Sequence, residues 1–104
     1  RPLAAPTREI ADVIAAECVY VLNSFYELPA PKVAEALRSA MAMPSVETPN
    51  HDLLLRALEL FEYFVLGFAD CHLVASAEML GVDSVASFDR GIDRVDSVRR
   101  IEAV

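Results

Sequence analysis

A chain of 104 residues, of which 55% are hydrophobic, is expected to form one domain with a sizeable core, and this argues against intrinsic disorder. The formal net charge of −7 argues against binding nucleic acid through a basic surface, although bound cations would neutralise part of that charge locally. The two cysteines, Cys18 and Cys71, lack metal-type spacing and are expected to be buried thiols in a reducing compartment. No apolar run is suited to cross a membrane, so we expect a cytoplasmic protein.

The first half of the chain predicts two helices flanked by short strands. From Val13 to Phe25 the hydrophobic residues follow the i, i+3, i+4 spacing of a helix, with Asp12 as its N-cap. Pro29 ends this helix, and Pro31 suits the first position of the next one. The expected elements are a strand over 7–11, a helix over 13–25, a helix over 31–43 and a strand over 45–48.

The second half predicts two further helices and two strands. Asn50 is expected to cap the first helix, Gly67 separates the two helices, and Gly81 suits the C-terminal end of the second. The segment Val82–Phe88 is apolar on both faces of the strand period, as expected for a strand in a covered parallel sheet. The expected elements are helices over 51–64 and 69–80, a strand over 82–88, a turn or short helix over 90–95 and a strand over 98–104.

Strands that alternate with helices favour an α/β sandwich with a mainly parallel sheet. In such sheets the functional crevice lies at the carboxyl ends of the strands, which is where Asp89 is expected. The side chains expected to face the core from the four helices are Val13, Ile14, Cys18, Val21, Leu22 and Phe25; Val33, Leu37 and Met41; Leu54, Leu55, Leu58, Phe61 and Val65; and Leu73, Val74, Ala77 and Leu80.

Three carboxylates occupy positions with little evident structural use. Glu17 lies in the apolar stripe of the first helix, Asp70 opens the fourth helix, and Asp89 ends a hydrophobic strand. Burying a lone carboxylate is costly unless a cation or hydrogen bonds compensate. Each acid also has a simpler interpretation: Glu17 as an exposed acid, Asp70 as a partner of the helix dipole, and Asp89 as the cap of a turn.

Taken together, the three acids indicate a metal-dependent nuclease site. If they converge, they suit a hard divalent cation such as Mg²⁺, which prefers oxygen ligands. Hydrolysis of a phosphodiester needs an activated water and a stabilised leaving oxygen, and one or two such cations supply both. Without a cation, clustered acids would repel one another.

The last third of the chain holds weaker candidates. Asp93 is either a fourth acid of the cluster or a solvated partner of neighbouring arginines, and Ser87 is placed to hydrogen-bond near the site. The basic residues that would either contact phosphates or balance nearby acids are Arg90, Arg94, Arg99 and Arg100.

Several motifs of this chain occur together in one known family. The most specific are Leu66–Ala75, then Gly81-Val82, then Ser87-Phe88-Asp89-Arg90. They resemble the second half of PIN-domain ribonucleases, and among these the VapC-type toxins of bacterial toxin–antitoxin pairs. Ala16–Leu22 is similar to the family's mid-domain helix with its acidic residue, and Val98–Ile101 is similar to its final strand.

This resemblance implies a single PIN-like domain over residues 1–104, with a three-layer α/β/α sandwich around a mainly parallel sheet. It implies a toxin that is an endoribonuclease, uses Mg²⁺ or Mn²⁺ to cut RNA, and has a cognate antitoxin as partner; a homodimer is also expected. The implied site residues are Glu17, Asp70 and Asp89 as catalytic and metal-binding acids, Asp93 as a further metal ligand, and Ser87, Arg90 and Arg94 as RNA contacts.

The chain departs from the family pattern at three points. Ser87 replaces the usual Thr, and Gly91 stands where many members carry another Asp. The family's opening strand, which lies in the middle of the sheet and carries an Asp-x-Asn stretch, has no counterpart in a chain that begins at Arg1. Because a sheet without its central strand has open edges, we expect a separate N-terminal segment, a swapped partner chain or a rearranged sheet to fill that place.

Two other interpretations compete with the nuclease. One is a non-catalytic interaction module, truncated and acidic, whose partner surface is the apolar helix Val13–Phe25. The other is a purely helical scaffold with scattered surface acids. Metal binding that depends on Asp70 would separate the nuclease from both.

Overall fold

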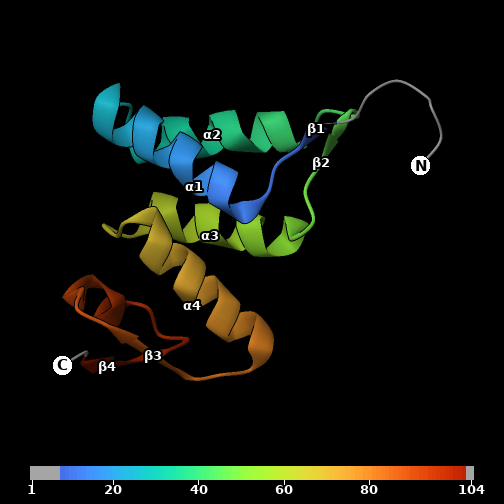
Figure 1. Cartoon of the computed structure of the whole chain (residues 1–104). Helices are drawn as coiled ribbons and strands as arrows, with labels where there is room; N and C mark the ends of the chain where they lie inside the picture. Colours follow the sequence, from blue (N-terminus) through green and yellow to red (C-terminus); the bar gives the residue numbers. More distant parts are fainter. Residues whose placement is uncertain (1–7, 103–104) are drawn as a thin grey trace. The chain divides into compact units, whose positions relative to one another are not determined.

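The computed structural model describes residues 8–102, and the chain divides into two units between His51 and Asp52 (Figure 1). The elements of the first unit are β1 (Arg8–Glu9), α1 (Asp12–Tyr20), the π-helix η1 (Val21–Phe25), α2 (Ala30–Met41) and β2 (Val46–Glu47). Those of the second unit are α3 (His51–Tyr63, whose first residue ends the first unit), α4 (Phe68–Leu80), β3 (Ser84–Ser87), the 3-10 helix η2 (Arg90–Arg94) and β4 (Arg99–Glu102).

In the first unit, α2 has the regular amphipathic pattern and α1 does not. The two helices lie side by side (Figure 1). The predicted inward face of α2 is confirmed, with Ala34 added to it. In α1 the buried residues are Ala15 and Val19, whereas Val13 and Phe25 of the expected stripe are 64% and 76% exposed. That prediction was wrong because the segment is apolar nearly all round, so its periodicity does not select one face.

The helix that starts at Asp12 changes its hydrogen bonding after Tyr20. Val21–Phe25 form a π-helix, which ends where the Tyr26 amide donates to the Val21 carbonyl at 3.1 Å. Glu27 then adopts a left-handed backbone with a φ of 56°, and the Asn23 side chain donates to the Leu28 carbonyl at 2.9 Å. Pro29 follows, so the predicted end of this helix is confirmed.

One predicted helix cap differs from the structure. Ala11 is the N-cap of α1, and Asp12 is its first residue, where an acid interacts favourably with the helix dipole. Asn50 directly precedes α3, and its side-chain amide donates to the Asp12 carboxylate, with distances of 3.3 and 3.2 Å to the two oxygens; its role as the cap of α3 stays a prediction. The α2 helix begins one residue before the predicted Pro31.

The second unit is built on α3 and α4. The buried residues of α3 are Leu54, Ala57, Leu58, Leu60 and Phe61, and those of α4 are Phe68, Cys71, Val74, Ala75 and Ala77. Val65, Leu73 and Leu80 were expected in the core but are exposed. Gly81 ends α4 in the left-handed conformation with a φ of 71°, as predicted.

Each unit has a parallel pair of strands. In the first, β1 pairs with β2; in the second, β3 pairs with β4, with Ser84 opposite Arg99 and Ser87 opposite Glu102. The parallel direction confirms the expected mixed α/β class and contradicts a purely helical scaffold. Within β3 alternate residues are buried, so the expectation that both of its faces are covered was wrong. The three-layer sandwich and the single domain over residues 1–104 stay predictions.

Within residues 8–102, none of the helices combines the length and apolar character that crossing a bilayer requires.

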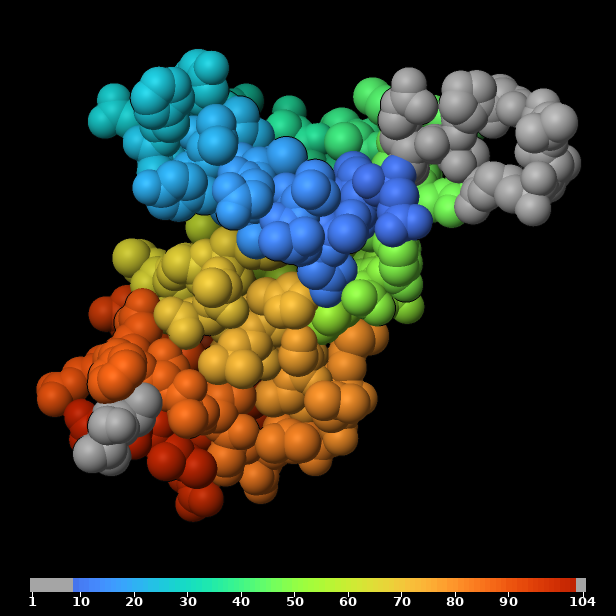
Figure 2. Space-filling view, in the orientation of Figure 1, coloured from blue at the N-terminus to red at the C-terminus, as the bar shows by residue number. Residues whose placement is uncertain are grey.

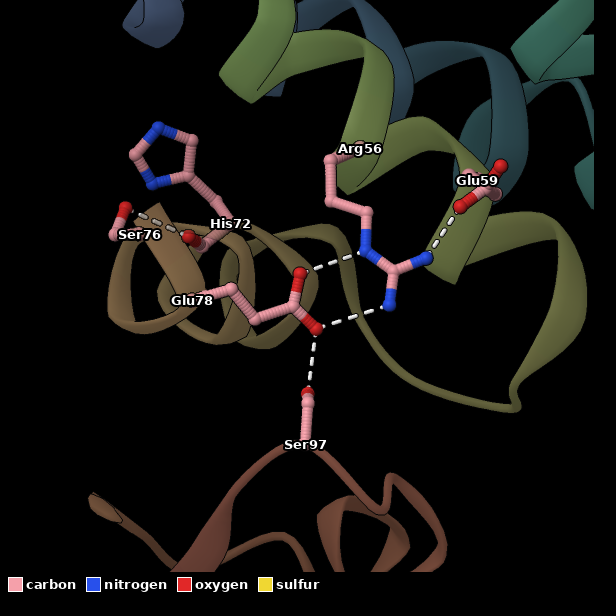
Figure 3. A network of polar contacts seen from close by, with 6 residues as sticks. All are labelled: Arg56, Glu59, His72, Ser76, Glu78 and Ser97. Carbon is pink, nitrogen blue, oxygen red and sulfur yellow. Dashed lines mark hydrogen bonds and ion pairs between the residues drawn. The ribbon is translucent and has the colours of Figure 1, made fainter. Parts of the chain in front are cut away.

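A polar network joins α3, α4 and the loop before β4 (Figure 3). Arg56 of α3 donates to both carboxylate oxygens of Glu78 on α4, at 2.7 and 2.9 Å, and also contacts Glu59. Ser97, in the loop that leads into β4, donates to the same Glu78 carboxylate. The hydrogen bond from Arg56 is the main cause that lowers the pKa of Glu78. The network therefore connects the two helices to the strand pair.

Replacing Glu78 by Gln should lower the free energy of unfolding at neutral pH by about 1 kcal/mol, because the pair is only partly exposed. Because folding lowers the pKa of Glu78, its carboxylate stabilises the folded state fully at a pH above the pKa it has in the unfolded chain. This stabilisation is lost as the pH falls through the pKa it has in the folded protein. Urea unfolding followed by circular dichroism should therefore show that wild type and E78Q converge in strongly acidic solution. Glu59→Gln, which alters an exposed partner of the same guanidinium, is the control and should change stability little.

Candidate functional site

The side chain of Ser87 joins two of the predicted acids. Ser87 is the last residue of β3 and is 8% exposed. Its hydroxyl donates to Asp70 Oδ1 at 3.1 Å and accepts from the Asp89 backbone amide at 3.1 Å. Asp70, in the first turn of α4, and Asp89, just beyond β3, therefore belong to one hydrogen-bonded cluster, which we call the Ser87 cluster.

Asp89 has a structural role as well as a candidate catalytic one. It is the N-cap of η2, and its Oδ1 accepts the Gly91 amide at 2.8 Å. The interpretation of Asp89 as a turn cap is thus correct, and this cap fixes the carboxylate next to the end of the strand. A capping carboxylate has a second oxygen, which leaves Asp89 able to act as a ligand.

The backbone at Gly91 is too crowded for a side chain. A Cβ added there would lie 2.9 Å from Leu66 Cδ2, 3.0 Å from Asp89 Oδ1 and 3.1 Å from the Val65 carbonyl oxygen. Glycine therefore allows η2 to pack closely beside the segment that precedes α4. An acid at this position would need the local backbone to move.

The thiol of Cys71 lies beside the Ser87 cluster. Cys71 is fully buried, and this burial raises its pKa to about 12, with further contributions from the charges of Asp70 and Asp89. Both carboxylates are thus close enough to affect the same sulfur. The thiol stays protonated and acts as a small apolar side chain, as the sequence suggested for Cys71. Cys18, in contrast, is exposed, so its predicted burial was wrong.

Asp93, the candidate fourth acid, forms an ion pair with Arg100. Arg100 Nε donates to Asp93 Oδ1 at 2.9 Å and Nη2 to Oδ2 at 3.4 Å, while Nη1 donates to the Ser87 carbonyl at 3.2 Å. The side chain of Arg100 is 11% exposed and that of Asp93 is 54% exposed. The hydrogen bond that Arg100 donates to Asp93 is the main cause that raises the pKa of Arg100.

The other candidates lie outside this hydrogen-bonded group. Glu17 is exposed on α1, in the first unit, so it is not the buried acid that its position in the apolar stripe suggested. Arg90 and Arg94 are exposed on η2, which leaves both guanidinium groups accessible to a polyanion.

The Ser87 cluster has the donor chemistry that a hard divalent cation prefers. Two carboxylates and a hydroxyl are oxygen ligands of the kind that Mg²⁺ and Mn²⁺ take. Among the residues that the structure describes, however, no three His, Cys, Asp or Glu side chains form a group that could hold a metal ion. The second unit therefore offers a suitable but partial oxygen set, to which further ligands must be added.

The sequence left open whether the four arginines contact phosphates or balance nearby acids. The structure shows that Arg100 balances Asp93 with a side chain that is 11% exposed, whereas Arg99 next to it is exposed. The alternation of side chains along a strand was the available signal, since neighbouring residues point to opposite faces.

The comparison with protein families matches the PIN domain over residues 3–98. This range includes every candidate acid and every candidate arginine except Arg99 and Arg100. No curated protein and no solved structure gives a significant match.

Replacing Gly91 by Ala should lower the free energy of unfolding by about 1–3 kcal/mol, because the new methyl group is forced against a backbone carbonyl and the Asp89 carboxylate. Chemical denaturation measures the change. Gly67→Ala is the matched control, since a Cβ at Gly67 meets nothing within 4 Å. Equal stability of the two variants would contradict the close packing at Gly91.

Proposed function

The chain belongs to the PIN domain family, and we propose that it is a metal-dependent endoribonuclease, the toxin component of a toxin–antitoxin pair. PIN domains are generally nucleases, which gives the general class of activity. The observation that carries the more specific proposal is the Ser87 cluster, in which one buried hydroxyl connects Asp70 with the segment that positions Asp89.

The proposed division of roles follows from the hydrogen bonds. Ser87 orients Asp70 by donating to Oδ1, and the Gly91 amide orients Asp89 in the same way. Asp70 and Asp89 would hold a Mg²⁺ or Mn²⁺ ion through oxygens that these bonds leave accessible. When bound, such an ion supplies positive charge that activates water and stabilises the leaving oxygen of a phosphodiester.

Further groups belong to the proposal. Glu17 stays a proposed third carboxylate ligand, and a swapped partner chain is a proposed source of another. Asp93 can join as a ligand only if its hydrogen bonds to Arg100 break. Arg90 and Arg94, exposed on η2, would contact RNA phosphates.

The proposed protein partners are an antitoxin and a second copy of the chain. An acidic chain with a net charge of −7 gains little from long-range attraction to RNA. The proposal therefore requires that a few arginines and the bound cations contact the RNA phosphates directly.

Asp70→Asn should lower metal-dependent cleavage of a mixed RNA pool by about 100-fold or more, because the amide keeps the shape of the side chain but removes its charge. Cleavage is followed by gel electrophoresis with Mn²⁺, with Mg²⁺ and with chelator. Asp52→Asn is the matched control: Asp52 also lies in the first turn of a helix, but it is exposed on α3.

Cleavage that persists with chelator, or that survives in D70N, would overturn the proposed site. If folded wild type cuts no RNA under any of these conditions, the nuclease proposal gives way to the interaction module described next.

A non-catalytic interaction module is the second candidate, and the surface of the first unit favours it. Tyr20, Phe25 and Tyr26 are 67%, 76% and 64% exposed, together with Val13 on the same segment. In Figure 2 this segment runs from blue to cyan along the first unit and lies at the surface of the view. On this alternative, Phe25→Ser should weaken self-association in analytical ultracentrifugation, whereas D70N should leave it unchanged.

A further inference from the structure

The guanidinium of Arg100 has hydrogen-bond partners on two elements, and most of the side chain is shielded from solvent. Arg100 lies on β4, opposite Val85 of β3, and its side chain is 11% exposed. Two of its nitrogens bind the Asp93 carboxylate, and a third binds the carbonyl of Ser87, two residues beyond Val85. The planar fork of arginine makes this two-sided arrangement, which a lysine ammonium could not reproduce.

Through Ser87, this contact reaches both acids of the proposed centre. The carbonyl of Ser87 accepts from Arg100, while its hydroxyl donates to Asp70 and accepts from the Asp89 amide. Ser87 is thus fixed at its backbone and its side chain at once. A change in its backbone orientation would turn the hydroxyl away from one or both acids.

Asp93 is suited to hold Arg100 in place. If Asp93 turned away to bind a cation, the guanidinium would lose its bidentate partner and keep only the Ser87 carbonyl as a hydrogen-bond acceptor. Arg100 is also affected by the charges of Glu102 and Asp89. An Arg100 without Asp93 would therefore interact more strongly with Asp89 and compete with a cation for that carboxylate.

We infer that Arg100 is a positioning residue, which orients the Asp70 and Asp89 carboxylates through Ser87, and that Asp93 is the counter-ion of Arg100 and not a metal ligand. The inference rests on the proposed function, since it assigns roles around the same centre. It changes the expected ligand set of the second unit to Asp70 and Asp89.

A double-mutant cycle tests the role of Asp93. Mn²⁺ affinity is measured by isothermal titration calorimetry for wild type, D93N, R100Q and the D93N/R100Q pair. If Asp93 acts through Arg100, D93N should weaken binding by about 10-fold in wild type and have no effect in the R100Q background. An equal loss of affinity in both backgrounds would show that Asp93 is a ligand and would overturn the inference.

Amide hydrogen exchange by NMR tests Arg100 without any metal. R100Q and the conservative R100K should each speed exchange at the Asp89 and Gly91 amides by about 10-fold, while amides in the middle of α3 keep wild-type rates. Arg99→Gln is the control, because Arg99 is the exposed neighbour on the same strand. Unchanged exchange at both amides in R100K and R100Q would overturn the positioning role.

The two measurements separate failure of this inference from failure of the proposed function. Wild type that binds no Mn²⁺ would contradict the metal-dependent nuclease, and the exchange rates would still decide the role of Arg100. If wild type binds Mn²⁺ and the losses of affinity in D93N and R100Q add up in the double variant, the nuclease proposal stands and the counter-ion role of Asp93 is rejected.

Discussion

The candidate site depends on the hydroxyl of Ser87, because this one group donates a hydrogen bond to Asp70 on α4 and accepts another from the backbone at Asp89, just after β3. It fixes the start of α4 relative to the end of β3 through Asp70, and it fixes the turn into η2 through the Asp89 amide. Alanine would fill a similar volume but would leave the Asp70 oxygen and the Asp89 amide without this partner. Loss of a buried partner costs more than the bond itself contributes.

Two arginine networks compensate for a strand pair that is small. A two-stranded ladder of four residues per strand has little stability of its own and needs packing against other elements. Arg56 connects α3 to Glu78, which also binds the loop before β4, and Arg100 connects β4 to η2 and β3. Fold and site are therefore stabilised through the same strand, so substitutions on β4 are expected to affect both.

The sequence predicted the order of elements well and the buried faces unevenly. Prolines and glycines set the boundaries of α2 and α4, because their backbone preferences act locally. The inward faces of α1 and part of α4 were misjudged, since segments rich in apolar residues on all sides leave the choice of face to tertiary packing. The two-sided role of Arg100 could not be predicted, because it depends on the register between β3 and β4.

Steric and electrostatic constraints together explain why the second unit offers few acids for a cation. At Gly91 a Cβ would lie 3.1 Å from the Val65 carbonyl and 3.0 Å from Asp89 Oδ1, so an acid there would need these neighbours to shift. The next acid along η2, Asp93, is paired with Arg100, which also binds the Ser87 carbonyl. Asp70 and Asp89 are then the two carboxylates of the Ser87 cluster. Because cation affinity rises with the number of charged ligands, a centre of this kind gains most from a carboxylate contributed by another segment.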